Sequence, residues 1–187
     1  MKSLLLSAFA LLLPLNVLAK DAAVKTINLD GDLYTKANMR YDAERKTGSY
    51  IQYLKLALLP ANSKVRVKDV SKKGYKMTVP GGDTIQVEYK QEWGGKPLEE
   101  ILPDLFSEKA TSAGIAKLSE LDRKGVRSGR ALVGMTKAGV IAALGLPAAH
   151  KTPSIEADLW EYWANRFITF NVVFKNGRVE DIGSAGR

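Results

Sequence analysis

The sequence contains no cysteine and only one histidine, His150, among its 187 residues. Without cysteine, the chain can form no disulfide, has no thiolate nucleophile and lacks the usual ligands of structural zinc. His150 has no Gly-x-Ser-x-Gly motif beside it that would complete a Ser-His pair. The sequence also lacks a calcium-binding loop and a phosphate loop with its Lys-Ser/Thr ending. We therefore expect no catalytic residue, no metal site and no cofactor, and the sequence predicts a protein that is not an enzyme.

The main apolar run near the start is too short to span a bilayer. Leu4 to Leu13 is ten residues long, whereas a membrane-spanning helix needs about 20. Lys2 precedes this run, and Val17-Leu18-Ala19 fits a small-residue cleavage site. We predict that residues 1–19 are a signal peptide, cleaved after Ala19, with a transmembrane anchor as the alternative. The mature protein is then expected to be periplasmic or associated with the outer membrane.

Acidic residues are fewer than basic ones, 20 against 28, so the net charge is +8. For an exported protein this charge favours anionic partners such as lipid headgroups, lipopolysaccharide, cell-wall polymer or an acidic protein, and disfavours nucleic acid. One local cluster of cations stands out in the sequence. It consists of Arg123, Lys124, Arg127 and Arg130, with no acidic residue between them. It is either a solvated helix end or a contact with an anionic envelope component.

Short strands separated by turns are predicted in the first half of the mature chain. Residues 65–68 and 85–90 alternate apolar and polar side chains, which is the period of a half-exposed strand. Residues 37–41 and 50–59 supply further predicted strands, and residues 60–63 form a turn. About five short strands without a helical period fit a small closed barrel better than a flat sheet with two exposed edges.

Residues 20–92 are therefore predicted to form an SH3-like barrel. The segments Tyr34-Thr35-Lys36, Arg40-Tyr41, Leu59-Pro60 and Lys64-Val65 resemble the opening of exported bacterial SH3-like domains. Apolar residues then recur at helical spacing from Leu98 to Leu105, with Pro103 inside the run. This pattern predicts a helical linker over 93–112, which is either a hinge between domains or a helix packed on the barrel.

The clearest local pattern is the helix predicted after Thr136. Thr136 is a good N-cap, Val140 and Leu144 belong to one apolar stripe, and Gly145 supplies the left-handed stop. A preceding helix is predicted at 113–122, where apolar residues recur every three positions.

Aromatic and β-branched residues follow this helix in two runs, 160–163 and 167–174, which predict two strands. The pair Asn176-Gly177 predicts a two-residue type I′ turn that places Phe174 opposite Val179. The stretch after the helix is therefore predicted to be a three-stranded antiparallel meander.

These C-terminal motifs resemble the SmpA/OmlA family, which includes the BamE component of the outer-membrane β-barrel assembly machinery. The resemblance rests on Gly134-Met135-Thr136, the run to Leu144-Gly145, the Trp160 to Trp163 strand and Val173 to Val179. It implies a BamE-like α-α-β-β-β two-layer domain over 113–187, so the expected fold class is α+β. Familiar members carry a lipid on a cysteine, which this sequence lacks. Gly139 also replaces the acidic residue that usually follows the cap.

The aromatic strand predicts a recognition surface. Trp160 and Trp163 should point to opposite faces of the sheet, and we expect Trp160 to be the buried ring. The expected partner-binding residues are Trp163 and Phe167, together with the four cations of the cluster.

The leading hypothesis is a non-catalytic envelope protein that binds another protein, by resemblance a component of outer-membrane assembly or envelope maintenance. One alternative is a peptidoglycan or envelope-polymer binder that acts through the N-terminal β-domain. Another is a protein inhibitor of the β-lactamase inhibitory protein type.

Overall fold

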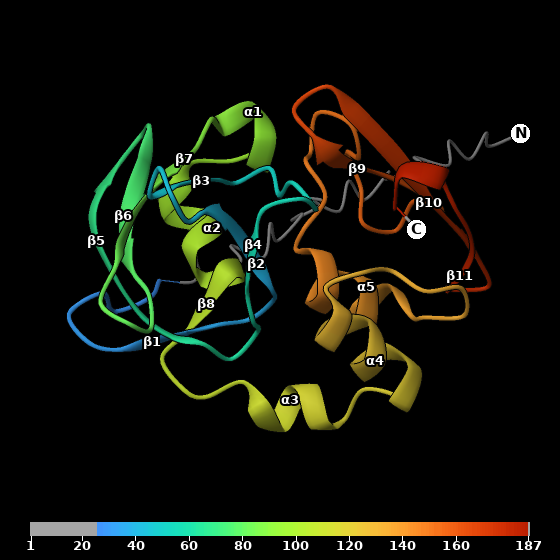
Figure 1. Cartoon of the computed structure of the whole chain (residues 1–187), viewed down its shortest axis with the longest axis horizontal. Coiled ribbons are helices and arrows are strands. Elements are labelled where there is room, and N and C mark those ends of the chain that lie inside the picture. Colours follow the sequence, from blue (N-terminus) through green and yellow to red (C-terminus); the bar gives the residue numbers. More distant parts are fainter. Residues whose placement is uncertain (1–25, 187) are drawn as a thin grey trace, which may run out of the picture.

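A computed structural model of the chain describes residues 26–186, so the predicted signal peptide lies outside the described residues. The chain forms two lobes that lie side by side (Figure 1). We call residues 26–111 the first lobe and residues 112–186 the second lobe. Among the described residues, no helix has the length and apolar character needed to cross a bilayer.

The first lobe is built on one eight-stranded sheet in the order β4-β2-β3-β7-β6-β5-β1-β8. All of its ladders are antiparallel except the one between β3 and β7, which is parallel. The strands are β1 (Leu33–Thr35), β2 (Met39–Asp42), β3 (Thr47–Ser49), β4 (Ala57–Leu59), β5 (Lys64–Ser71), β6 (Gly74–Thr78), β7 (Thr84–Glu88) and β8 (Phe106–Ser107).

This sheet must curl because of a short connection. Strands β1 and β2 are five positions apart in the sheet order, which is about 24 Å in a flat sheet with strands 4.8 Å apart. Yet they follow each other in sequence, and the chain from Thr35 to Met39 spans at most about 14 Å. The sheet therefore bends until its two sides approach, and it encloses a core.

Helix α2 (Leu98–Leu105) completes the first core. It follows the short helix α1 (Gln91–Gly94), and its residues Leu98, Ile101 and Leu102 are buried. They join the strand residues of the curled sheet in one hydrophobic cluster. The segment predicted as a helical linker thus carries α2 and β8, and both contribute side chains to the first core.

The second lobe begins with three short helices and ends with three strands. The helices are α3 (Ser112–Ala116), α4 (Glu120–Ser128) and α5 (Lys137–Leu144), and the strands are β9 (Leu159–Asn165), β10 (Ile168–Lys175) and β11 (Arg178–Ile182), followed by η1 (Ser184–Gly186). The strands form an antiparallel sheet in the order β11-β10-β9.

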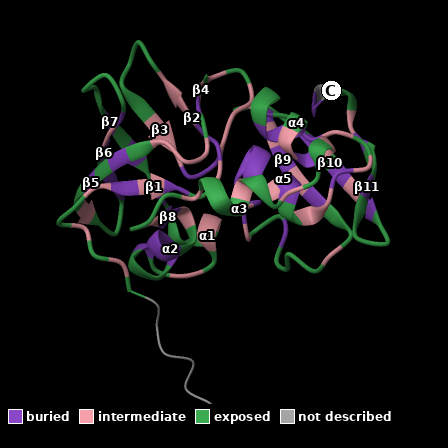
Figure 2. Cartoon of the chain, turned by 90° about the horizontal axis from the view of Figure 1, so that it is seen from below, coloured by how far each residue is buried: buried purple, intermediate pink, exposed green. Residues whose placement is uncertain are grey.

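One face of the three-stranded sheet packs against α4 and α5 in a second hydrophobic core. Trp160 is fully buried at its centre, and its ring lies 4.6 Å from that of Phe174. Figure 2 shows the buried residues in two groups, one in each lobe. The prediction that Trp160 is the buried ring is confirmed.

The predicted fold class is wrong. The chain is mostly β, with a curled eight-stranded mixed sheet and a separate three-stranded sheet, and does not consist of a small SH3-like barrel followed by a BamE-like α-α-β-β-β domain. The sequence pattern missed β1, β3 and β8, because strands of only two or three residues show no readable alternation of apolar and polar side chains. It also could not indicate that β3 pairs in parallel with β7, some 40 residues later.

The prediction of a single helix at 113–122 is also wrong. Two helices occupy this region, and α4 begins only after Ser119, whose side chain accepts a hydrogen bond from the Asp122 backbone N–H. The C-terminal order is therefore three helices and three strands. By contrast, the structure confirms the Thr136 cap of α5 and the pairing of Phe174 with Val179.

An acidic residue does reach the start of α5, but from another helix. The Asp122 carboxylate accepts hydrogen bonds from the Thr136 backbone N–H at 2.8 Å and from the Thr136 hydroxyl at 3.1 Å. A Cβ atom at Gly139 would lie 2.1 Å from Asp122 Oδ1. Glycine at this position therefore makes room for the carboxylate, which replaces the missing capping-box acid.

The buried tyrosines predict that the fold loses stability at high pH. Burial raises the pKa of Tyr75 and of Tyr162, so both phenols stay protonated in the folded state. Unfolded tyrosine ionises near pH 10, and the unfolding free energy then falls by about 1.4 kcal/mol per pH unit for each such group. The Tyr75 hydroxyl has no hydrogen-bond partner among the described residues.

We therefore expect Tyr75→Phe to be at least as stable as the wild type at pH 7 and to lose stability less steeply above pH 10. Denaturant unfolding across this pH range measures both effects. If the unfolding free energy of the variant falls with pH as steeply as that of the wild type, the pKa of Tyr75 is the same in the folded and unfolded states, which would contradict the prediction.

Candidate functional site

Two polar side chains of the first lobe hold the second lobe in place. Asn38 is 3% exposed, and its amide nitrogen donates to the carbonyls of Val126 at 2.8 Å and Ala143 at 3.0 Å. Its amide oxygen accepts from the Ala61 backbone N–H at 2.8 Å. These bonds fix the loop after β1 against α4 and α5.

Arg40 makes the second connection. Its guanidinium donates to the carbonyls of Leu54 and Leu56 in its own lobe and to that of Gly129 at the end of α4. Burial, together with the nearby charge of Arg130, lowers the pKa of Arg40. Because both connections use buried or half-buried groups, the relative position of the lobes is well defined.

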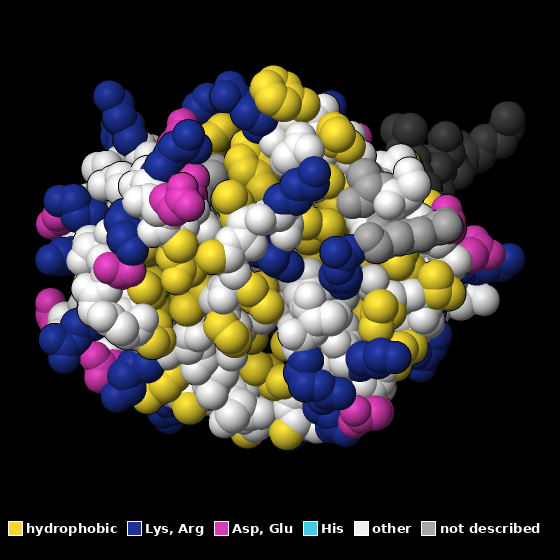
Figure 3. All heavy atoms as spheres, viewed as in Figure 1, with side chains coloured by type: hydrophobic (Ala, Val, Ile, Leu, Met, Phe, Trp, Pro, Cys, Tyr) yellow, Lys and Arg dark blue, Asp and Glu magenta, His cyan; other side chains and the backbone are white. Residues whose placement is uncertain are grey.

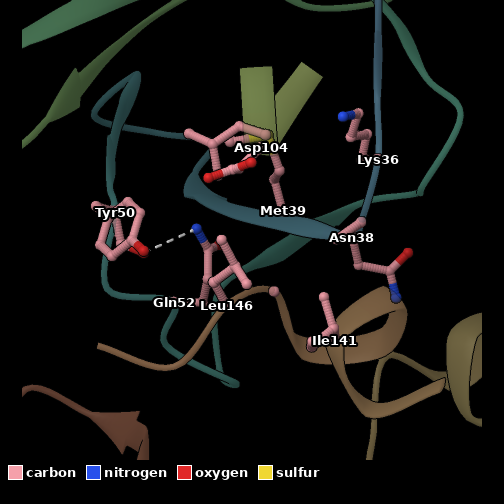
Figure 4. A pocket seen from close by; sticks show the side chains of 11 residues that line it. Lys36, Asn38, Met39, Tyr50, Gln52, Asp104, Ile141 and Leu146 are labelled. Carbon is pink, nitrogen blue, oxygen red and sulfur yellow. Dashed lines mark hydrogen bonds between the residues drawn. The ribbon is translucent and has the colours of Figure 1, made fainter. Parts of the chain in front are cut away.

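A small cavity lies beside these connections. It has a volume of about 40 Å³, room for little more than a water molecule. Figure 4 shows that Lys36, Met39 and Tyr50 line it from the first lobe and Ile141 and Leu146 from the second. It is a packing gap between the lobes and too small for a substrate or cofactor.

A much larger groove opens where the β9–β10 turn approaches the first lobe. Its volume is about 540 Å³, within the range of ligand-binding sites. Tyr53 and Leu56 form part of its lining, together with polar residues of β3 and β7. Its charged lining residues are Asp42, Arg45, Lys55, Glu88 and Arg166. We call this the interlobe groove.

The β9–β10 turn presents an exposed aromatic ring beside the interlobe groove. The Asn165 side-chain oxygen accepts hydrogen bonds from the backbone N–H groups of Phe167 at 2.9 Å and Ile168 at 3.1 Å. This local network holds the turn while leaving Phe167 83% exposed and Ile168 49% exposed. The Arg166 guanidinium lies 5.0 Å from the centre of the Phe167 ring. Figure 3, viewed as in Figure 1, shows hydrophobic side chains along the middle of the molecule, with charged side chains of both signs around them and Lys and Arg side chains also among them.

Trp163, the other predicted partner-binding aromatic residue, lies on the sheet face opposite Trp160 and is half-buried. Its ring lies 5.7 Å from that of His150. Its backbone forms a parallel bridge with Tyr53, and its carbonyl accepts from the Leu54 N–H at 3.3 Å. Trp163 is thus close to the interlobe groove but is largely occupied by contacts within the protein.

The basic cluster lies on and just after α4, away from the β9–β10 turn (Figure 1). No acidic residue lies between the four cations in sequence, but Glu120, just before them, pairs with Arg123 at 2.7 Å and with Arg127 at 2.9 Å and so neutralises part of the charge. Hydrogen bonds from Arg123, and then from Arg127, lower the pKa of Glu120. Arg123 also donates to the carbonyls of Ala116, the last residue of α3, and of Leu118 just beyond it. Lys124 and Arg130 are exposed.

The structure therefore separates the predicted partner-binding residues into two places. Phe167 and Trp163 lie near the interlobe groove, and the basic cluster lies elsewhere. Sequence reasoning missed Lys55, Glu88 and Arg166, because only the folded chain brings them to one groove. The signal that could have pointed to Arg166 is its place in Asn165-Arg166-Phe167, a polar and cationic break between two aromatic strands.

In the part of the chain that the structure describes, no group of three or more His, Cys, Asp or Glu residues is placed to hold a metal ion. The Asp42 carboxylate, whose pKa is lowered mainly by a hydrogen bond from the Arg45 backbone N–H, serves as a local turn cap. The arrangement at the groove is suited to binding.

Comparison with known proteins does not assign the chain to a family: no protein-family model, curated protein or solved structure matches it.

Proposed function

We propose that the protein is a non-catalytic, exported envelope protein that binds another protein through the interlobe groove and the adjoining β9–β10 turn. The observation that carries this proposal is the exposure of Phe167, 83%, in a turn that side-chain hydrogen bonds hold in place. A rigid aromatic ring that is already exposed loses little entropy on binding and buries a large area. The fixed position of the lobes supports the same reading, because the two walls of the groove are preorganised.

The proposed partner is a protein of the cell envelope. The resemblance of the C-terminal third to the SmpA/OmlA family points to the outer-membrane β-barrel assembly machinery as the partner to test first. The proposed localisation, periplasmic or outer-membrane associated, rests on the predicted signal peptide.

Capture of partners from solubilised envelopes tests the proposal. We expect the wild-type protein to retain a specific envelope protein and Phe167→Ser to lose most of it. Val133→Ser is the matched control, since Val133 is also an exposed hydrophobic residue, 60% exposed, but lies before α5. Equal retention by the two variants would contradict a role for the turn.

Sedimentation with purified cell wall separates this function from the polymer-binding alternative. Co-sedimentation of both the wild type and Phe167→Ser, without capture of any envelope protein, would favour wall binding instead.

A further inference from the structure

Some of the charged side chains around the interlobe groove have no ion-pair partner among residues 26–186. Asp42 is engaged, because it accepts from the backbone N–H groups of Glu44 and Arg45 and pairs with the Arg45 guanidinium at 3.3 Å. Lys55 and Arg166, by contrast, form no ion pair with any of the described residues. Two cations that pair with no carboxylate in the described part of the chain therefore line one groove.

These two cations come from different lobes. Lys55 lies in the loop before β4 of the first lobe, and Arg166 lies in the β9–β10 turn of the second. The hydrogen bonds of Asn38 and Arg40 hold the two lobes together. They therefore fix the distance between the backbone positions of Lys55 and Arg166. Tyr53 and Leu56 offer apolar surface in the same groove. The groove thus offers positive charge and an apolar contact together.

The remaining lining favours a peptide over a flat anionic surface. Glu88 forms no ion pair among the described residues, and with Asp42 it places negative charge within the same groove. A segment whose acidic residues are spaced apart can place its carboxylates at Lys55 and Arg166 and a neutral residue at Glu88, whereas a uniformly anionic lipid surface would also place negative charge against Glu88. Thr47, Ser49 and Gln86 supply hydrogen-bonding groups to which a peptide backbone can bind.

We propose that the interlobe groove takes an acidic peptide segment of the partner protein. Carboxylates of the segment lie against Lys55 and Arg166, and an apolar side chain of the segment lies against Tyr53 and Leu56. The proposal rests on the proposed protein-binding function and names the chemistry of the partner. Phe167 borders the groove and extends the apolar contact beyond it.

The test uses a short fluorescein-labelled peptide of alternating Glu and Leu, titrated with the full chain by fluorescence polarisation. A Gln–Leu peptide of equal length is the neutral control. We expect the Glu–Leu peptide to bind more tightly and its affinity to fall with added salt, because exposed charges are screened. Equal affinity for the two peptides would overturn the proposal.

Charge reversal identifies the groove. Lys55→Glu combined with Arg166→Glu should weaken binding of the Glu–Leu peptide by about tenfold or more. Lys117→Glu combined with Lys124→Glu is the matched control, because it changes the net charge equally at exposed positions just after α3 and on α4. Both pairs are exposed, so thermal unfolding should confirm that each variant folds. Equal weakening by the two variants would mean attraction by net charge alone and would overturn the proposal.

Experiments with the same variants would reveal a different occupant of the groove. Binding to phosphatidylglycerol vesicles that is lost in the Lys55→Glu, Arg166→Glu variant, with no peptide binding, would identify a lipid site and overturn the proposal. A wild-type dimer that this variant dissociates would identify a second copy of the chain as the occupant, with the same consequence. If Phe167→Ser loses the envelope partner but neither peptide binds, the proposed function stands and the acidic-peptide inference fails.

Discussion

Trp160→Ala is expected to lower the unfolding free energy by about 3 to 5 kcal/mol, the range for removing a large ring from a packed core. The ring is fully buried and packs against Phe174 in the second core. Its indole nitrogen has no hydrogen-bond partner among the described residues, so the loss comes from packing and from the contact with the Lys137 ammonium, which lies 5.8 Å from the ring centre. Denaturant unfolding followed by circular dichroism measures it.

Trp163→Ala is the matched control on the same strand. Its half-buried ring contacts His150, and such a ring pair contributes about 1 kcal/mol. We therefore expect a much smaller loss of stability than for Trp160→Ala. Equal losses for the two variants would mean that both faces of the three-stranded sheet are covered to the same extent.

Asn38→Ala is expected to destabilise the protein by about 3 kcal/mol, because it removes three buried hydrogen bonds to backbone groups. These groups are the carbonyls of Val126 and Ala143 and the N–H of Ala61. Of the three, the Val126 carbonyl keeps a second hydrogen bond, from the Gly129 N–H. For a chain of this size, the loss corresponds to a drop in melting temperature of roughly 6 to 12 °C. Differential scanning calorimetry measures it directly.

Asn28→Ala is the control for this prediction. The Asn28 side chain also accepts a hydrogen bond from a backbone N–H, that of Asp30, but at an exposed site. Water replaces that bond, so the expected change is below about 0.5 kcal/mol. A similarly small effect of Asn38→Ala would contradict the view that Asn38 fixes the lobes.

Local features of the fold were predictable from the sequence because adjacent residues determine them. Thr136 caps α5, and its side chain accepts from the Gly139 N–H. Asn176 and Gly177 both have positive φ, as a type I′ turn requires, and they set the register of β10 with β11. The alternation of side chains along β9 correctly placed Trp160 in the core.

Features that depend on residues far apart in the sequence were not predictable. The parallel pairing of β3 with β7 and the curl of the eight-stranded sheet arise from packing around a shared core. The Asp122 carboxylate that caps α5 comes from a different helix. For the same reason the interlobe groove was missed: Lys55, Glu88 and Arg166 belong to three separate segments and meet only in the folded chain.

Photo-crosslinking in cells, from a probe amino acid placed at Phe167, tests the central claim most directly. Ala113 on α3 is the control position, since it is exposed and lies at the opposite end of the molecule from the β9–β10 turn (Figure 1). We predict that the Phe167 probe gives a discrete adduct that mass spectrometry identifies as an envelope protein, and that the Ala113 probe does not. No adduct from Phe167, or the same adducts from both positions, would contradict the claim that this protein binds a partner through the β9–β10 turn and the interlobe groove.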